Sequence, residues 1–364
     1  MIVFDKVSKV FADGTTAVDR LSLAVPNGKL TVFVGSSGSG KTTALRMINR
    51  MIEPTAGAIT IDGVDVSTLN PVKLRLGIGY VIQHAGLMPH LRVIDNVATV
   101  PVLKGQPRRA ARKAAYQVLE RVGLDPKLAT RYPAQLSGGE QQRVGVARAL
   151  AADPPILLMD EPFSAVDPVV RHDLQNEILR LQSELRKTIV FVTHDIDEAL
   201  RLADHVAVFK GGSLQQYDEP ARLLSRPAND FVAKFIGLGR GYRWLQLIDA
   251  TGLPLHDVEF LPADSLPNSG LPDGWAVVVD GAGAPMGWID TEGLRRHRAG
   301  ASLPDSMSGI GSLFRPRGNL SQALDAALSS PSGVGVAVDD GGKVIGGVRA
   351  ADVLAAVDAR RRER

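Results

Sequence analysis

A glycine-rich segment near the amino terminus has the composition of a phosphate-binding loop. It reads Gly-Ser-Ser-Gly-Ser-Gly-Lys-Thr over residues 35–42, with glycines at the first and sixth positions. Glycines let backbone N–H groups turn inward around a β-phosphate, and a helix start adds a positive partial charge. Lys41 would reach the β- and γ-phosphate oxygens, and the Thr42 hydroxyl would bind Mg²⁺. A flexible glycine-serine turn is the alternative, but an apolar run precedes the segment and a helix-like run, 43–51, follows it.

Two adjacent carboxylates follow a second apolar run. Residues 156–159 read Ile-Leu-Leu-Met, and Asp160 and Glu161 come directly after them. Phosphoanhydride hydrolysis needs a magnesium-associated aspartate and a glutamate that activates water. We therefore expect Asp160 to hold the metal shell and Glu161 to polarise the attacking water. An acidic turn after a core strand would be the favoured interpretation if the chain had no phosphate loop.

A second helix start could also bind an anion. Ser137 and Glu140 have the spacing of a capping box, and apolar residues follow them at helical intervals. Gly138 and Gly139 carry no side chains that would keep a phosphate from the backbone amides. The alternative is a well-capped helix without a ligand.

Three further residues are candidates because of their positions. His194 follows the apolar run 188–192 and Gln83 follows 78–82, so both would lie at the carboxyl edge of a parallel sheet, where α/β proteins bind ligands. Gln83 could bind Mg²⁺ or orient water. An ordinary polar strand end and a structural histidine are the alternatives for these two residues. Phe11 could stack on an adenine ring, although a phenylalanine in an alternating strand belongs to the core more often.

Apolar periodicity predicts the elements that must position these residues. Residues 1–25 tend to alternate between apolar and polar side chains, as half-buried antiparallel strands do. Helical stretches separate the apolar runs 30–34, 156–159 and 188–192, which indicates a parallel α/β core. Residues 89–153 are rich in good helix formers, so we expect a helical subdomain inserted into that core.

The remainder of the chain is expected to form a smaller α+β domain. The core should close near residue 241, and residues 242–274 include a stretch rich in proline, glycine and aspartate, as linkers are. Two strand-turn-strand units follow within 275–358, and helical stretches flank the second of them. This internal repeat predicts a separate tandem domain. Residues 359–364 form a basic tail.

Composition excludes several classes of protein. The 364 residues include no cysteine, which rules out disulfides, thiolate nucleophiles and cysteine-bound zinc. Hydrophobic residues make up 45% and charged residues 22%, as in a folded globular chain rather than a disordered one. A net charge of +3 does not by itself indicate a nucleic-acid partner. No apolar run reaches the ~18 residues of a membrane span, so other subunits would have to cross any membrane involved.

These motifs, in this order and spacing, resemble those of the ATP-binding-cassette ATPases over residues 1–241. The phosphate loop corresponds to Walker A, the two carboxylates to Walker B, residues 136–139 to the Leu-Ser-Gly-Gly signature and residues 164–167 to the D-loop. The resemblance implies an α/β P-loop NTPase core with antiparallel β and helical subdomains. It also implies a head-to-tail dimer, in which ATP and Mg²⁺ lie between Walker A of one copy and the signature helix of the other.

The resemblance assigns roles residue by residue. Glu161, His194 and Gln83 would be catalytic, and Thr42, Gln83 and Asp160 would bind the metal. The residues that would bind the nucleotide are Phe11, Gly35, Ser36, Ser37, Gly38, Ser39, Gly40, Lys41, Thr42, Thr43, Gln83, Ser137, Gly138, Gly139 and Asp167.

Other stretches are similar to ATPase subunits of glycine betaine, carnitine and choline importers, namely residues 43–50, 79–83, 87–90 and 227–235. This resemblance implies uptake of quaternary-ammonium compatible solutes, or proline-type ones. The implied partners are a second copy of the chain, two transmembrane permease subunits and, indirectly, an extracytoplasmic solute-binding protein, without nucleic acid. The chain would lie at the cytoplasmic face of the cell membrane. The substrate follows from analogy alone, since no residue of this chain would touch the solute.

In that group a pair of CBS repeats often follows the cassette, and the tandem units resemble such a pair. Repeats that bind adenine nucleotides usually carry a glycine, a Thr or Ser hydroxyl and, three residues further on, an aspartate. The second repeat keeps Gly346 and Asp352 but has Arg349 at the hydroxyl position, and the first departs too, with Asp290 and Gly293 at the corresponding places. A structural or dimerising role is therefore at least as well supported as nucleotide sensing.

Several other interpretations are open from the sequence. The importer could carry an amino acid, a polyamine or an inorganic ion. A soluble ATPase that remodels nucleic acid or ribosomes is another alternative, but such relatives usually have two cassettes or a long coiled coil, and this chain has one phosphate loop. Glu161 and His194 disfavour an ATP-sensing regulator without turnover. The basic cluster 360–364 would either sense ionic strength near an anionic lipid surface or be a solvated terminus.

Overall fold

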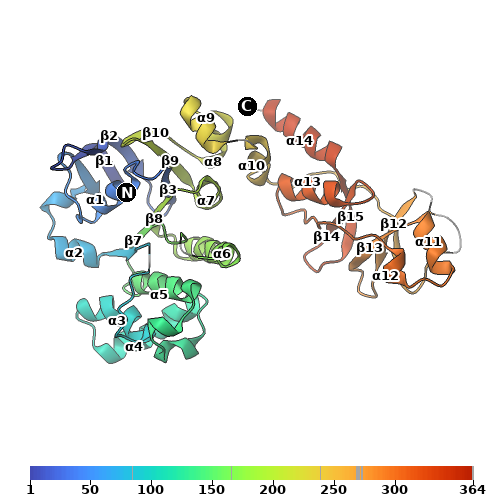
Figure 1. The fold of residues 1–364 in the computed structure, drawn as a ribbon, viewed down its shortest axis with the longest axis horizontal. Coiled ribbons are helices and arrows are strands. Elements are labelled where there is room, and N and C mark those ends of the chain that lie inside the picture. Colours follow the sequence, from blue (N-terminus) through green and yellow to red (C-terminus); the bar gives the residue numbers. More distant parts are fainter. Residues whose placement is uncertain (84, 165, 238, 268–270, 272–273, 363–364) are drawn as a thin grey trace. The chain divides into compact units, whose positions relative to one another are not determined.

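The computed structural model describes residues 1–83, 85–164, 166–237, 239–267, 271 and 274–362 (Figure 1). Contacts within the chain divide it into two compact units. Unit 1 is Met1–Gly237 and unit 2 is Leu238–Arg364. Unit 1 therefore ends slightly before the predicted boundary at residue 241.

A mostly parallel sheet forms the centre of unit 1. Its strands, in spatial order, are β10 (Ser213–Asp218), β9 (His205–Lys210), β3 (Leu30–Gly35), β8 (Thr188–Thr193), β7 (Ile156–Asp160) and β6 (Ile78–Val81). Strand β10 is antiparallel to β9, and the other neighbouring pairs are parallel. Every residue of β3, β7 and β8 is buried, as the continuous apolar runs predict. Because these strands are parallel, the carboxyl ends of β3, β6, β7 and β8 share one edge of the sheet.

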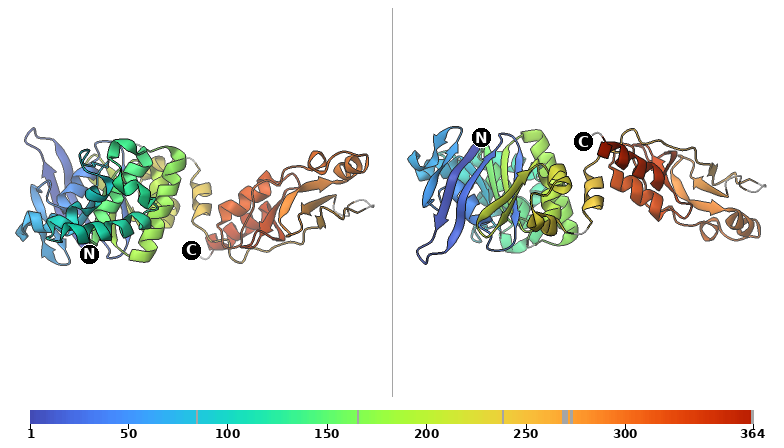
Figure 2. Two further views of the ribbon diagram at one scale, coloured as in Figure 1. Left: turned by 90° about the horizontal axis from the view of Figure 1, so that it is seen from below. Right: turned by 90° about the horizontal axis from the view of Figure 1, so that it is seen from above.

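An antiparallel sheet with the order β2-β1-β4-β5 lies beside the central sheet (Figure 2). Its strands are β1 (Ile2–Val10), β2 (Thr16–Val25), β4 (Ala56–Ile61) and β5 (Val64–Asp65). The pairing of β1 with β2 confirms the antiparallel strands predicted in residues 1–25. The Tyr217 hydroxyl of β10 donates a hydrogen bond of 2.8 Å to the Ala24 carbonyl of β2, which ties the two sheets together.

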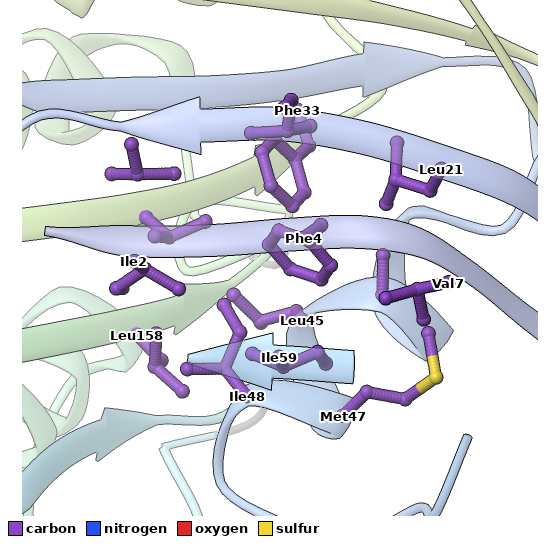
Figure 3. Packing of buried hydrophobic residues seen from close by; sticks show 14 of the residues in the cluster. Ile2, Phe4, Val7, Leu21, Phe33, Leu45, Met47, Ile48, Ile59 and Leu158 are labelled. Carbon is purple, nitrogen blue, oxygen red and sulfur yellow. The ribbon is translucent and has the colours of Figure 1, made fainter. Parts of the chain in front are cut away.

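The main hydrophobic cluster of unit 1 joins both sheets to helix α1 (Lys41–Ile48). Phe4 of β1, Phe33 of β3 and Leu45 of α1 are at most 1% exposed, and they meet in the centre of this cluster (Figure 3). The rings of Phe4 and Phe33 contact edge to face, with centroids 6.3 Å apart. This packing fixes α1 against the carboxyl end of β3, so residues 36–40 must form the turn between them.

Helix α1 begins and ends earlier than the predicted run 43–51. It starts at Lys41, with Gly40 as its N-cap in the left-handed region (φ +97°), and its last residue is Ile48. Arg50 has a left-handed φ of +55°, a backbone conformation that cannot continue a helix. Further helices of unit 1 are α2 (Pro71–Leu76), α6 (Pro168–Leu185), α7 (Ile196–Leu202), α8 (Pro220–Ser225) and α9 (Asp230–Ile236), with a 3₁₀ turn at Val66–Thr68.

The region predicted as a helical subdomain, residues 89–153, contains a group of helices at one end of unit 1 (Figure 1). They are α3 (Val93–Leu103), α4 (Arg108–Arg121) and α5 (Gly138–Leu150), with 3₁₀ segments at Pro126–Thr130 and Pro133–Gln135. Arg112 of α4 makes two hydrogen bonds of 2.8 Å to the Asp95 carboxylate of α3. This two-pronged contact fixes α4 against α3.

Unit 2 contains the two predicted hairpins, β12-β13 and β14-β15. Its elements are α10 (Arg240–Gln246), β11 (Phe260–Pro262), β12 (Trp275–Val279), β13 (Pro285–Asp290), α11 (Thr291–Arg298), α12 (Leu303–Ser306), α13 (Leu320–Ser329), β14 (Val334–Val338), β15 (Val344–Arg349) and α14 (Ala350–Arg362). Val277 and Trp288 of the first hairpin and Val336 of the second are buried in one cluster. The two hairpins therefore pack against each other.

The prediction that residues 242–274 form a linker is wrong. Strand β11 within this segment pairs in parallel with β12, and the Trp244 and Ala250 side chains are buried. His256 and Gly347 exchange two backbone hydrogen bonds of 2.8 Å each. The prolines and glycines of this segment limit regular structure, but its backbone is paired with the hairpins, so the segment belongs to unit 2.

The carboxyl end of the described chain lies in α14, which includes Arg360. Residues 363–364, and the side chains of 361 and 362, fall outside the described residues, so the predicted role of the basic cluster 360–364 stays a prediction. Within the described ranges we find no helix that is both long enough and apolar enough to cross a bilayer.

Candidate active site

The phosphate loop connects β3 to α1 and encloses the amine of Lys41. This side chain is 4% exposed, and its Nζ donates to the carbonyls of Gly35 and Ser36, each at 2.8 Å, and to Ser39 Oγ at 3.3 Å. Burial lowers the pKa of Lys41, while the carboxylates of Glu161 and Asp160 oppose that shift. The loop therefore holds a desolvated ammonium group at the carboxyl edge of the sheet.

Glycine is required at two loop positions because the backbone is crowded there. A Cβ on Gly35 would collide with the Phe209 carbonyl, and one on Gly40 would collide with the Ala17 carbonyl. Gly38 also has a positive φ, +75°, but open space surrounds it. The remaining predicted loop residues differ in exposure: Ser36 and Ser37 are exposed, Ser39 is buried, and Thr42 and Thr43 are half-buried.

Asp160, at the end of β7, joins the loop to its supports. Its Oδ1 accepts from Thr42 Oγ1 at 2.8 Å, and its Oδ2 accepts from Arg46 Nη2 at 3.2 Å and from the Tyr80 hydroxyl at 3.3 Å. Burial, together with the negative charge of Asp160, raises the pKa of Tyr80, so its hydroxyl keeps its proton and can donate. The two predicted metal ligands Thr42 and Asp160 thus lie in contact.

The oxygen donors of this pair suit a magnesium ion. Mg²⁺ usually takes one or two protein oxygens and fills its other positions with phosphate and water. No group of three or more His, Asp or Glu side chains in the described part of the chain could hold a metal by itself. Thr42 and Asp160 therefore fit a site that needs a bound nucleotide to complete it.

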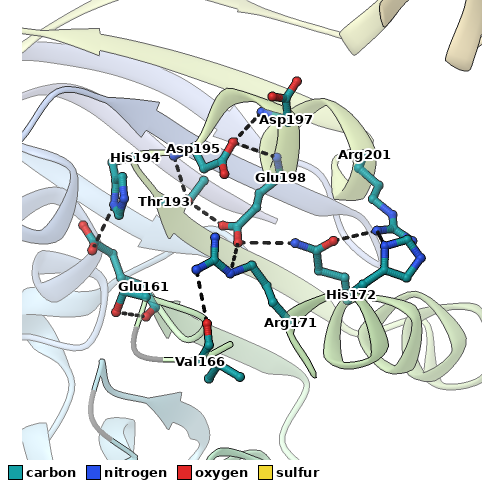
Figure 4. Close-up of polar contacts among 12 residues, drawn as sticks. Glu161, Val166, Arg171, His172, Thr193, His194, Asp195, Asp197, Glu198 and Arg201 are labelled. Carbon is teal, nitrogen blue, oxygen red and sulfur yellow. Dashed lines mark hydrogen bonds and ion pairs between the residues drawn. The ribbon is translucent and has the colours of Figure 1, made fainter. Parts of the chain in front are cut away.

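The three predicted catalytic residues meet at Glu161. Its Oε2 lies 3.2 Å from Nδ1 of His194, the residue after β8 (Figure 4). The same oxygen accepts from Gln83 Nε2 at 3.4 Å. Glu161 has a left-handed φ of +44°, which is strained for a residue with a side chain. The contact shown for Gln83 is with Glu161, so its second predicted role, as a metal ligand, has no support from this geometry.

The signature segment forms the capped helix start that its sequence predicts. Ser137 N donates to Glu140 Oε2 at 2.7 Å, and Glu140 N donates to Ser137 Oγ at 3.3 Å. Gly138 is exposed, whereas Gly139 is buried. A Cβ on Gly139 would lie 2.5 Å from Val170 Cγ1, so the start of α5 touches the first turn of α6. Anion binding by residues 137–139 stays a prediction.

Two other predicted nucleotide contacts lie on exposed segments. Asp167, in the D-loop, is exposed and precedes α6, while Ala165 of the same loop lies outside the described residues. Phe11 follows β1 and is 40% exposed, with Lys9 Nζ 5.4 Å from the centroid of its ring. Its assignment to the core, the alternative from the sequence, is wrong, and adenine stacking stays a prediction.

Sequence reasoning missed the residues that support Asp160. Arg46 is four residues after Thr42, so both lie on one face of α1, and helical spacing could have identified Arg46. Tyr80 belongs to β6, which neighbours β7, but its sequence position gives no sign that its hydroxyl reaches Asp160.

In unit 2 the aspartates at the predicted nucleotide positions have structural partners. Asp352 Oδ2 accepts from His256 Nε2 at 2.8 Å and from the backbone N–H of Arg349 at 3.1 Å. Asp290 caps α11 by accepting from the Gly293 N–H at 2.6 Å. A cavity of about 640 Å³ lies beside Arg349. Nucleotide sensing and a structural or dimerising role therefore both stay predictions for this unit.

Comparisons with known proteins found relatives that match most of this chain. A family model described as ABC transporter matches residues 18–164. The glycine betaine/carnitine/choline transport ATP-binding protein OpuCA of Bacillus subtilis is 42% identical over 323 residues, which cover 86% of this chain and 83% of that protein. The osmoprotectant import ATP-binding protein OsmV of Salmonella typhimurium is 42% identical, covering 79% of each chain. The glycine betaine uptake system ATP-binding protein YehX of Escherichia coli is 50% identical over 68% of this chain and 80% of its own length.

A solved structure shows the same fold in unit 1. The dimeric ATP-binding cassette MJ0796, in a post-hydrolysis state bound to ADP and Pi, matches with a TM-score of 0.56 and 33% identity, over 60% of this chain and 99% of that chain. The predicted P-loop ATPase fold is thereby confirmed. The chain belongs to the ATP-binding proteins of the ABC transporter family, and it has the ATPase fold of that family.

Proposed function

We propose that this chain is the ATP-hydrolysing subunit of an importer for solutes that carry a trimethylated nitrogen. The meeting of Glu161 with His194 and Gln83, next to the contact between Thr42 and Asp160, is the observation that carries the ATPase role. The relatives described above are named for the transport of glycine betaine, carnitine, choline or osmoprotectants, and the three named solutes share the trimethylated group. The cargo is thus proposed by analogy with these relatives.

Each side chain of the site has a defined part in hydrolysis. Glu161 would accept a proton from the attacking water, with His194 and Gln83 fixing the direction of its carboxylate. Lys41 would place its ammonium against the phosphate oxygens. Mg²⁺, held by Thr42 and Asp160, would neutralise part of the negative charge on the phosphates. Arg46 and Tyr80 would keep Asp160 in position, as their hydrogen bonds to Oδ2 do here.

The proposed assembly is a head-to-tail dimer on a membrane permease. Residues 137–139 of one copy would complete the phosphate site of the other, and the dimeric cassette found among similar solved structures supports this arrangement. Two permease subunits would cross the membrane, and a solute-binding protein would deliver the cargo outside. The chain would work at the cytoplasmic face, and nucleic acid has no part in the proposal.

The Glu161→Gln variant tests the ATPase role. It should hydrolyse ATP about 10²- to 10⁴-fold more slowly, the usual effect of removing a general base, while ATP still binds. Glu184→Gln, on the exposed surface of α6, is the matched control and should hydrolyse ATP at the normal rate. Normal turnover in the Glu161→Gln protein would contradict the role assigned to Glu161.

Uptake by cells tests the cargo. Cells whose only copy of this gene carries Glu161→Gln should lose uptake of radiolabelled glycine betaine or choline. Cells whose only copy carries Glu184→Gln should keep that uptake. An amino acid or a polyamine should be taken up equally well in both strains. Uptake of glycine betaine and choline that survives Glu161→Gln would refute the cargo without affecting the assignment as an ATPase.

Trimethylamine N-oxide is a second candidate cargo. The trimethylamine N-oxide transport system ATP-binding proteins TmoW of Ruegeria pomeroyi and Pelagibacter ubique are 48% and 45% identical to this chain, over 62% and 63% of its length. This solute also has a trimethylated nitrogen. Competition between labelled glycine betaine and unlabelled trimethylamine N-oxide would show which of the two the complete importer prefers.

A further inference from the structure

The buried carboxylate of Glu198 contacts the residue that precedes His194. Glu198 of α7 is 7% exposed, and its Oε2 accepts a hydrogen bond of 2.6 Å from Thr193 Oγ1, at the end of β8 (Figure 4). The same hydroxyl accepts from the backbone N–H of Asp195 at 3.0 Å. Both residues that flank His194 are therefore tied to one hydroxyl, which Glu198 in turn holds.

The other oxygen of Glu198 faces α6. Gln175 Nε2 donates to Oε1 at 3.3 Å, and Arg171 Nε lies 4.0 Å from the same oxygen. Arg171 Nη2 also donates to the Val166 carbonyl of the D-loop at 3.2 Å. Val170, the residue before Arg171, is the one that the start of the signature helix approaches at Gly139. The Glu198 carboxylate thus connects the backbone around His194 to the turn of α6 that contacts the D-loop and the signature helix.

This arrangement is costly for stability alone. Burial raises the pKa of Glu198, which shows that the site disfavours its charged form. Arg171 Nε is buried and makes no hydrogen bond to any described residue, so this cation faces Glu198 at ion-pair distance without closer contact. A buried carboxylate with an incomplete ion pair stabilises a fold less than an apolar residue of similar size would. Its contacts with the residues that flank His194 indicate a role other than stabilising the fold.

We propose that Glu198 is a positioning residue of the ATPase, which holds His194 in register with Glu161 through Thr193 and couples that register to the D-loop through α6. The inference rests on the catalytic roles proposed for Glu161 and His194. Glu198 itself touches neither nucleotide nor water in this scheme. A displacement of about 1 Å at a reacting group can lower a rate about 100-fold, so the hydrogen bond between Thr193 and Glu198 can matter without contact to substrate.

Two substitutions each interrupt one side of this connection. Glu198→Gln keeps an oxygen for Thr193 but turns an amide N–H₂ toward Gln175 and Arg171. Thr193→Val keeps the shape of the side chain and removes the hydroxyl. In the purified full-length protein, each should lower kcat for ATP about 10- to 100-fold with little change in KM, because the phosphate loop is untouched. Thr193→Ser keeps the hydroxyl and should restore nearly normal kcat.

The effect must depend on His194. In a His194→Ala background, adding Glu198→Gln should change kcat less than about two-fold, since a residue that acts through another has no separate effect once that residue is lost. Glu184→Gln should change kcat in neither background, and thermal unfolding would show that all variants are folded. Wild-type kcat in Glu198→Gln, or an undiminished further fall in the His194→Ala background, would overturn the proposal. Normal hydrolysis by His194→Ala alone would instead overturn the catalytic role proposed for His194, and this proposal with it.

Discussion

The two units place similar aspartates at strand ends and helix starts, but they engage them differently. In unit 1, Asp160 meets the side chains of Thr42, Arg46 and Tyr80, each from a segment distant in the sequence. In unit 2, Asp290 accepts from a backbone amide three residues ahead, and Asp352 accepts from the Arg349 amide and from His256. The contacts of Asp160 bring side chains from several segments into one site. The contacts of Asp290 and Asp352 fix local turns and one neighbouring segment.

This difference distinguishes a candidate active site from a segment that only has a similar sequence motif. A short motif that ends in aspartate has the same letters whether the carboxylate caps a helix or faces a ligand. The distinguishing feature is convergence: groups from β3, β6, β7 and β8 meet at one sheet edge in unit 1, as ligand sites of α/β folds do. Substitutions can test whether the two units really differ in this way.

The largest difference is expected between Asp160→Asn and Asp352→Asn. Asp160→Asn removes the charge that Thr42 and Arg46 face, and it should lower ATP hydrolysis by about 10²- to 10³-fold, the usual effect of losing one preorganised charge contact. Asp352→Asn should leave hydrolysis within about two-fold of normal, because the contacts of Asp352 are all structural. Steady-state phosphate release from both purified variants measures this. A comparable fall in the Asp352→Asn protein would show that unit 2 takes part in turnover.

Glycine substitutions should give the next effect. Gly40→Ala places a methyl group against the Ala17 carbonyl at a positive φ, and it should lower the unfolding free energy by about 3 kcal/mol and abolish ATP binding. Gly38→Ala, with a positive φ but open surroundings, should cost only about 1–2 kcal/mol. Calorimetry and binding of a fluorescent ATP analogue test both. Equal losses of unfolding free energy in the two variants would mean that backbone strain, rather than collision with the Ala17 carbonyl, is what requires glycine at residue 40.

A smaller effect is expected within unit 2. His256→Ala removes the hydrogen bond to Asp352 and should lower the stability of this unit by about 1 kcal/mol, the usual contribution of one partly buried hydrogen bond. All three tryptophans, Trp244, Trp275 and Trp288, belong to unit 2. Urea titration followed by tryptophan fluorescence therefore reports on this unit. An unchanged midpoint would show that the contact between His256 and Asp352 contributes nothing to folding.

The smallest effect is expected at an exposed ion pair. Arg317 and Asp340 lie 3.1 Å apart, but their side chains are 86% and 74% exposed. Solvent and salt screen such a pair, so Asp340→Asn should not measurably change either the urea midpoint of unit 2 or ATP hydrolysis. A midpoint shift as large as that of His256→Ala would show that this exposed pair contributes as much to the stability of unit 2 as the partly buried contact of His256 does.

The sequence was sufficient to predict the strands and motifs of unit 1, because continuous apolar runs and glycine spacing are local signals. It also placed Glu161, His194 and Gln83 at strand ends, where they do meet. It failed for the supposed linker, since the pairing of His256 with Gly347 joins two segments that are 91 residues apart in the chain. The hydrogen bond from Tyr80 to Asp160 was not predicted, for the same reason. Contacts between distant segments leave little trace in local composition.

The left-handed backbone of Glu161 has a consequence for attempts to make this protein hardier. Non-glycine residues in that conformation cost about 1–2 kcal/mol, so the fold on its own favours glycine at this place. Glutamate at this position therefore lowers the stability of the fold, and the proposed catalytic role of its carboxylate accounts for that cost. An engineer who screens for heat resistance alone would be led to Glu161→Gly, which would relax the turn and remove the carboxylate proposed to activate water.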